Sequence, residues 1–139
     1  MADDGGIGRL RRRFAEMRTN IEEATQPALV KQANTMADTM RQLAPEDDGD
    51  LIDSIEVTEG GKSTPAYSQP GGQMVVPANA VAVTVGNHAV RYPHLQEHGT
   101  TKHPAQPFFW PAVRLHDKKS RQAIKRAIGA AVRKNWGKP

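Results

Sequence analysis

Cysteine is absent from this chain of 139 residues. The absence excludes disulfide bonds, thiolate metal sites and a cysteine nucleophile. It is also typical of proteins that stay in a reducing compartment. Whatever stabilises the fold must therefore come from packing, hydrogen bonds and contacts with other molecules.

Large apolar side chains are also scarce. Hydrophobic residues make up 37% of the chain and aromatic residues 5%, against 24% charged residues. This is low for an independent globule, yet not low enough for intrinsic disorder. Such a chain is expected to gain part of its stability from neighbouring subunits. Its length fits one domain over residues 1–139, with a flexible N-terminus at 1–6 and an extended loop at 62–72.

Long apolar runs are missing as well. The N-terminus reads MADDGGIGRLRRRF and has no apolar core, so we expect no secretory signal peptide. No apolar stretch approaches the length that spans a bilayer. We therefore expect a protein that is made in the cytoplasm and has no membrane partner.

Charge is abundant and unevenly distributed around a net charge of +4. Residues 102–139 contain ten Lys or Arg and a single acid, Asp117, and a second basic cluster lies at residues 9–13. The acidic residues near the middle are Glu46, Asp47, Asp48, Asp50, Asp53 and Glu56. This separation favours nucleic-acid binding, or docking between copies of the chain. Ordinary solvated helix faces are the alternative.

The apolar periodicity predicts an α+β fold. An apolar stripe at three- and four-residue steps predicts a long helix over 7–43, kinked or broken near Pro27, with Thr25 as a cap if a second helix starts there. Alternation predicts strands at 52–59, 73–76 and 79–87, which would form a small antiparallel sheet. Residues 88–111 are expected to be irregular. A basic helix from Pro111 to about residue 134 is expected to pack on one face of the sheet.

Residues 94–98 read HLQEH and match H-x-x-E-H, the inverted zinc-peptidase motif. On a helix, histidines at i and i+4 share a face and can both reach a zinc ion. However, Pro93 before the motif and Gly99 after it limit any helix to about one turn. No glutamate follows Glu97, so Asp117 or another histidine would have to be the third ligand. We therefore expect no metal site, no cofactor and no catalytic residue.

The segment YPHLQEHGTTKHPAQPFFWPAV, residues 92–113, holds four of the seven aromatic residues and four prolines. Prolines restrict the backbone, so this segment can be rigid without regular structure. The Glu97 carboxylate is placed to accept N–H bonds from the following turn, or to pair with an arginine.

Two segments of this chain resemble the tail-completion, or head-to-tail joining, proteins of long-tailed, lambdoid-type bacteriophages. The first is APEDDGDLIDSIEV, and the second runs from Tyr92 through EHGT and QPF to Pro111-Ala112. The order and spacing of these motifs agree over most of residues 30–133. The family has an aromatic residue where His98 stands. The resemblance singles out Pro45, Gly49, Leu51, Ser54, Ile55, Tyr92, Glu97, Gly99, Thr100, Pro107, Phe108 and Pro111.

The resemblance implies a structural virion protein rather than an enzyme. It implies a homo-oligomeric ring, of six subunits, at the neck of the particle, where the finished tail joins the DNA-filled head. Partners would be the connector or head-closure protein and the tail-terminator or tail-tube protein, with assembly in the host cytoplasm. Residues facing DNA or a partner would be Arg11, Arg12, Arg13, Lys118, Lys119, Lys125, Arg126, Arg133 and Lys134.

Three alternatives stay open. The first is a tail-terminator or head-closure protein of the same junction. The second is a basic nucleic-acid-binding module, in which Phe108 and Trp110 stack on bases. The third is the zinc peptidase, in which replacement of Glu97 by Gln would abolish activity.

Overall fold

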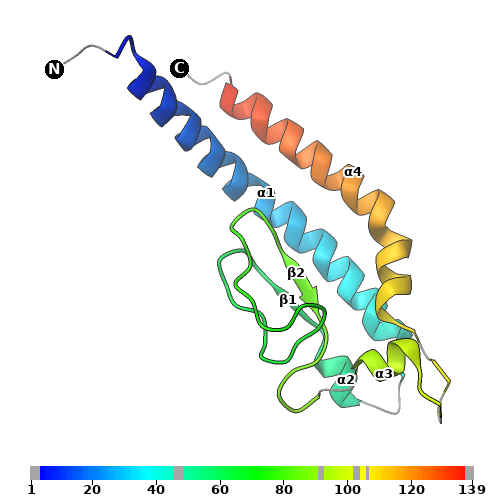
Figure 1. Cartoon of the computed structure of the whole chain (residues 1–139). Helices are drawn as coiled ribbons and strands as arrows, with labels where there is room; N and C mark the ends of the chain where they lie inside the picture. Colours follow the sequence, from blue (N-terminus) through cyan, green and yellow to red (C-terminus); the bar gives the residue numbers. More distant parts are fainter. Residues whose placement is uncertain (1–3, 46–48, 91–92, 102–103, 106, 137–139) are drawn as a thin grey trace.

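The computed structural model describes residues 4–45, 49–90, 93–101, 104–105 and 107–136. Figure 1 shows two long helices that lie side by side and run in opposite directions, with a small sheet and two short helices at one end. The prediction of an α+β fold with a long N-terminal helix, a small antiparallel sheet and a C-terminal helix is confirmed. The elements are α1 Ile7–Leu43, α2 Gly49–Asp53, β1 Glu56–Thr58, β2 Ala82–Thr84, α3 Pro93–His98 and α4 Phe109–Trp136.

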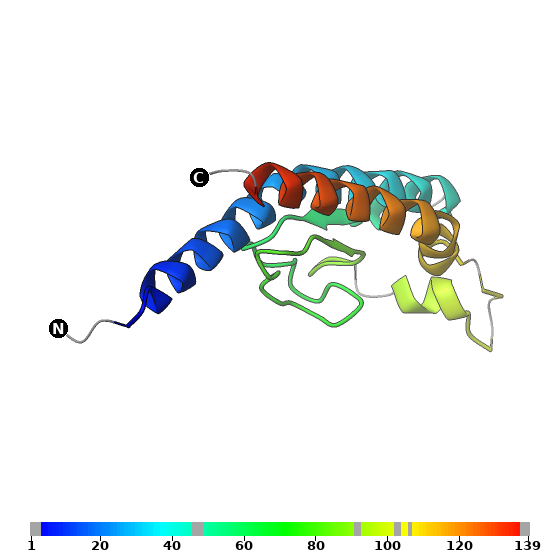
Figure 2. The same cartoon turned by 90° about the horizontal axis from the view of Figure 1, so that it is seen from above.

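Helix α1 continues through Pro27 without a break. Proline has no N–H and cannot bond the carbonyl four residues earlier, so it bends a helix that runs through it. Figure 2 shows the N-terminal part of α1 turned away from the direction of its C-terminal part. Thr25 is not a cap, because its hydroxyl donates to the Ile21 and Glu22 carbonyls inside the helix. Asp4 instead caps the first turn, since its carboxylate accepts the Gly8 N–H at 2.8 Å.

The sheet has two antiparallel strands, and both are shorter than predicted. Val57 pairs with Val83 at the centre of a three-residue register. The strand predicted at 79–87 shrinks to β2, because β1 ends before Gly60-Gly61 and offers no further partner. The strand predicted at 73–76 is reduced to one bridge, between Ser63 and Val75. A second bridge, between Gln69 and Val85, fastens the 62–72 loop to the end of β2.

Two short helices replace segments that were predicted otherwise. Residues 49–53 form α2, which includes the first two residues of the strand predicted at 52–59, because a helical turn places Leu51 and Ile55 together in the core. Residues 93–98 form α3 within the segment that was expected to be irregular. Pro93 is the first residue of α3, a position where its missing N–H has no cost.

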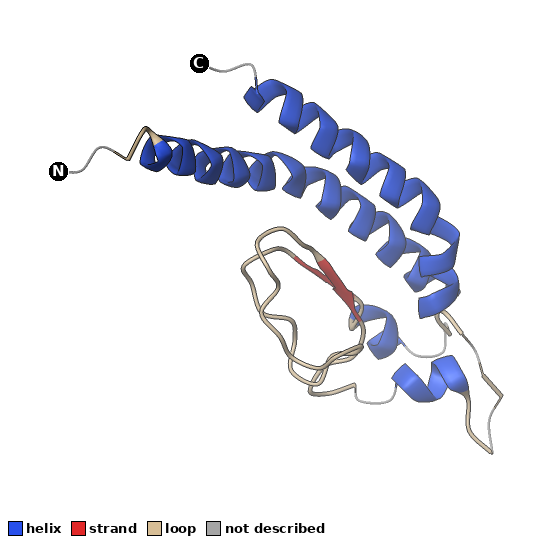
Figure 3. Cartoon of the chain, turned by 45° about the horizontal axis from the view of Figure 1, so that its top comes forward, coloured by secondary structure: helices blue, strands red, loops and turns tan. Residues whose placement is uncertain are grey.

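The molecule has two layers. Figures 2 and 3 show both long helices in one layer and the strands and loops in the other. The core lies between the layers, in the part where the C-terminal half of α1 meets the first turn of α4. Its buried members are Ala37, Met40, Ala44, Leu51, Ile55, Val85, Val90, Phe108, Phe109 and Ala112. The far ends of the two helices therefore extend beyond the core.

Within the described residues, no helix combines the length and apolar character needed to cross a bilayer.

Candidate functional site

Glu97, in α3, binds the N-terminus of α4 through its side chain. One carboxylate oxygen, Oε2, accepts the backbone N–H groups of Phe108 at 2.8 Å and Phe109 at 3.0 Å. The other oxygen, Oε1, accepts the N–H of Trp110 at 3.0 Å. The residue is nine-tenths buried, so these bonds are largely shielded from water. A negative charge at this place also interacts favourably with the helix dipole.

This arrangement satisfies the whole first turn of α4. The first four N–H groups of a helix have no partner inside the helix. Here Glu97 takes three of them, and the fourth position is Pro111, which has no N–H. The Glu97 side chain thereby joins the C-terminal part of α3 directly to the start of α4. The sequence predicted N–H bonds to Glu97, but from the turn that follows it rather than from a helix eleven residues later.

The aromatic residues beside this contact belong to the core. Phe108 is fully buried and Phe109 is 6% exposed. Trp110 stays 41% exposed and meets the Phe109 ring edge-on, at 5.0 Å between centroids. A small cavity of about 160 Å³ lies between this turn, α3 and the 69–70 loop. Since Phe108 is packed inside, stacking of that ring on a nucleic-acid base is not supported.

Glu97 of HLQEH is already used for a structural contact. It lies on a helix of six residues, and both oxygens of Glu97 are already engaged by backbone donors. A carboxylate held in this way is not free to act on a metal-bound water. Among the residues that the structure describes, no three metal-ligating side chains gather. Gly99 ends α3 with φ of 75°, the left-handed conformation that glycine adopts most easily at a helix end.

A second contact holds the α2 turn to the end of β2. The Ser54 hydroxyl donates to the Leu51 carbonyl at 2.7 Å and accepts the Gly86 N–H at 3.0 Å. Gly86 has φ of 91°, and a Cβ atom there would lie 2.9 Å from the Val90 carbonyl oxygen. The two segments singled out by the family resemblance therefore meet, because Leu51 and Phe108 belong to the same core cluster.

The remaining predicted residues lie around these two contacts. Gly49 begins α2 and is exposed, Pro45 is half-buried just after α1, and Ile55 is buried in the core. Thr100 and Pro107 are exposed between α3 and α4. Tyr92 lies outside the described residues.

The predicted basic residues are exposed, but they do not gather at one place. Arg11, Arg12 and Arg13 lie on the N-terminal part of α1, at the far end from α3 (Figure 1). Residues 118–136 of α4 contain seven Lys or Arg and no Asp or Glu. The basic members on α4 are Lys118, Lys119, Lys125, Arg126, Arg133 and Lys134, all exposed.

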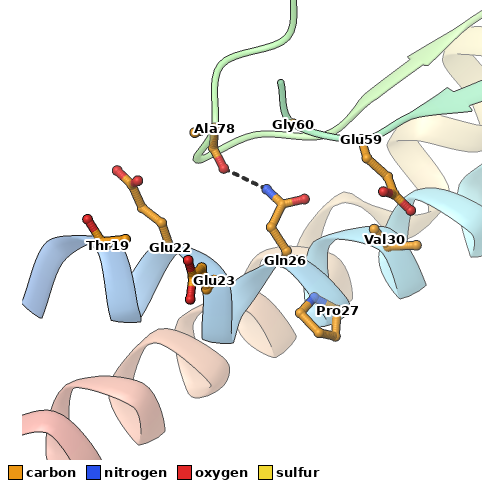
Figure 4. A pocket seen from close by; sticks show the side chains of 9 residues that line it. All are labelled: Thr19, Glu22, Glu23, Gln26, Pro27, Val30, Glu59, Gly60 and Ala78. Atoms are coloured by element: carbon orange, nitrogen blue, oxygen red, sulfur yellow. Dashed lines mark hydrogen bonds between the residues drawn. The ribbon is translucent and has the colours of Figure 1, made fainter. Parts of the chain in front are cut away.

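An acidic cleft that the sequence did not predict lies between α1 and the loop before β2. It encloses about 580 Å³ and is lined by Glu22, Glu23 and Glu59 among others. Figure 4 shows Gln26 reaching across it to the Ala78 carbonyl, at 2.8 Å. Glu22 and Glu23 lie on α1, whereas Glu59 follows β1, so the cleft forms only when these two segments pack together. No local sequence motif marks it. Glu22 and Glu59 already pair with neighbouring cations.

The chain was compared with known proteins. A protein-family model described as "Bacteriophage HK97-gp10, putative tail-component" matches residues 8–99. This stretch runs from α1 to the end of α3 and includes Glu97, while α4 lies outside it. Neither the curated proteins nor the solved structures gave a match. Because the matched stretch covers about two-thirds of the chain, this protein belongs to the HK97 gp10-like family of bacteriophage tail components.

Proposed function

We propose that this tail component forms a ring at the neck of the particle, completes the tail and joins it to the DNA-filled head. The subunits are equivalent, and six of them close the ring. The protein works by binding its neighbours and breaks no bond. A tail-terminator or head-closure position at the same junction is the nearest alternative.

The observation that supports this proposal best is the exposed apolar surface at the helix ends. Ile7, Leu10 and Phe14 on α1 are each about half exposed, and Trp136 on α4 is 69% exposed. Large apolar side chains grouped on a soluble chain usually mark a surface that another protein covers. For a member of a tail-component family, that other protein belongs to the virion.

The proposal is tested by the mass of the purified full-length protein, measured by native mass spectrometry at low and moderate salt, with and without EDTA. We expect a closed oligomer whose mass does not change with EDTA, or a monomer that assembles into rings when tail tubes are added. A protein that stays monomeric alone and on tail tubes contradicts the ring. One zinc per chain, lost with EDTA, would instead support the peptidase alternative.

Helix α4 gives a specific reason to retain nucleic-acid contact as a second function. Asp117 is the one acidic residue within α4, and the Arg121 guanidinium pairs with it at 2.9 Å. The surface is suited to phosphates without base recognition. Within a ring, this helix would face the DNA path or an acidic neighbour.

A further inference from the structure

The two long helices leave an apolar groove open between their far ends. Its volume is about 460 Å³, and we call it the helix-end groove. Its apolar lining comes from Phe14, Met17, Ile21, Leu29, Ile124 and Ile128. Figures 1 and 3 show α1 and α4 drawing apart at this end. The apolar stripe continues past the groove along α4 to Val132 and Trp136, which are 39% and 69% exposed.

The exposed charges beside this groove are cationic on its α4 side. On α1, Arg18 and Glu22 both line the groove and pair with each other at 3.1 Å, so that side adds no net positive charge. On α4, Lys125 lies one turn before Ile128, and Arg133 lies one turn before Trp136. All three cations are exposed. An occupant should therefore carry an apolar tip with carboxylates on the side that meets α4.

The chain itself carries such a surface at its other end. Residues 42–61 contain seven Asp or Glu. The cations that border this stretch are Arg41, which pairs with Asp38 and donates to the Ile55 carbonyl, and Lys62, which pairs with Glu59.

Among these seven acids, Asp50, Asp53 and Glu56 are exposed around α2 and the start of β1. Leu43, the last residue of α1, is 46% exposed beside them. We call these four residues the acidic corner.

We propose that the helix-end groove of one copy receives the acidic corner of a second copy. The inference rests on the proposed ring, and it names the surfaces that close it. Figure 1 shows α2 at the opposite end of the molecule from the N-terminal part of α1, which contributes Phe14, Met17 and Ile21 to the groove. A contact between two different patches of the same chain is heterologous, and such contacts build closed rings when the rotation between copies fits. Charge complementarity fixes which end meets which.

Two double substitutions test this contact in the full-length protein. The first reverses the groove rim with Lys125→Glu and Arg133→Glu. The second reverses the acidic corner with Asp50→Lys and Asp53→Lys. Each one alone places like charges across every interface, so we expect the concentration for half-assembly to rise at least about tenfold. Lys119→Glu with Lys134→Glu is the matched control, because these exposed residues do not line the groove and should not disturb assembly.

An equal mixture of the two reversed proteins makes the sharper test. In the mixture, each reversed rim can meet a reversed corner, and each native rim can meet a native corner. We therefore expect rings to form again, with the two proteins alternating. Circular dichroism establishes that each variant remains folded.

The absence of cysteine permits a second test. Leu43→Cys mixed with Val132→Cys should give a linked dimer with a short thiol crosslinker. Leu43→Cys mixed with Val75→Cys, another exposed position, should give none. Self-linking of Val132→Cys alone would show that two grooves pair with each other, and that result overturns the proposal.

The experiments distinguish a wrong interface from a wrong proposed function. Rings that the acidic-corner variant forms as well as the wild type overturn this interface and leave the ring standing. If the equal mixture of the two reversed proteins forms no rings, the interface is likewise overturned and the ring still stands. If the wild type forms no ring, alone or on tail tubes, the proposed function fails together with the interface.

Discussion

The carboxylate of Glu97 accepts the backbone N–H of Phe108 at 2.8 Å, although eleven residues separate the two along the chain. This bond, with those to Phe109 and Trp110, ties α3 to the first turn of α4. It explains the glutamate of HLQEH as a helix cap contributed by a neighbouring helix. The part of the chain covered by the family match thus includes, two residues before its end, the glutamate that positions the helix beyond it.

Replacing Glu97 should lower the free energy of unfolding. Gln keeps one acceptor oxygen but brings an NH₂ group against N–H donors, so we expect a loss of about 1–3 kcal/mol. Ala leaves the three N–H groups without partners, and the loss should be larger, about 2–5 kcal/mol. Urea denaturation measures both. Glu59→Gln, at an exposed ion pair, should change stability by less than about 1 kcal/mol. Equal stabilities for all three variants would contradict the capping role.

Thr84→Val should stabilise the protein. The Thr84 hydroxyl is buried and has no hydrogen-bond partner in the described part of the chain, so the folded state carries its desolvation cost. Val has nearly the same shape and suits a strand, and we expect a gain of about 1 kcal/mol. Thermal unfolding measures the difference. Thr64→Val is the control, because the Thr64 hydroxyl accepts the Met74 N–H at 2.8 Å, and its loss should be destabilising. A loss of stability in Thr84→Val would show that the hydroxyl has a role.

Gly86→Ala should be more costly than Gly61→Ala. Both glycines have positive φ, which costs an L-residue about 1–2 kcal/mol. At Gly86 the new methyl group would also meet the Val90 carbonyl and the Pro93 ring at about 3 Å, while at Gly61 nothing lies within 4 Å. We expect Gly86→Ala to lose at least about 1 kcal/mol more, since the surrounding backbone must shift. Equal losses in urea denaturation would mean that the turn at Gly86 relaxes freely.

Lys119→Glu with Lys134→Glu should weaken DNA binding without affecting rings. Each phosphate contact that is lost should lower the slope of log K against log salt by about 0.9. Fluorescence anisotropy with random duplex DNA at several salt concentrations gives this slope. Asp50→Lys with Asp53→Lys should not weaken DNA binding, because it removes no cation. Unchanged binding by the α4 variant would place the DNA contact elsewhere, or indicate that none exists.

The sequence alone determined the elements with strong periodicity. The stripe from Ile7 to Leu43 specified helical structure, because apolar residues at three- and four-residue steps share one helical face, but it left open whether the helix breaks near Pro27. The alternation around Val83 specified a strand for the same kind of reason, and Gly99 specified a helix end. The family resemblance also rested on local motifs, so it was visible before any fold.

Only the tertiary structure decided how these elements use their side chains. Leu51 lies in α2 and Ile55 lies just after it, because a helical turn directs both side chains toward the core. The strands stopped at three residues because the partner strand ended. The length of a strand therefore depends on its partner and cannot be read from one segment of sequence. Glu97 acquired its three donors from α4, and the groove between α1 and α4 arose because two helices diverge. These features depend on residues far apart in the chain, and distance along a sequence does not give distance in space.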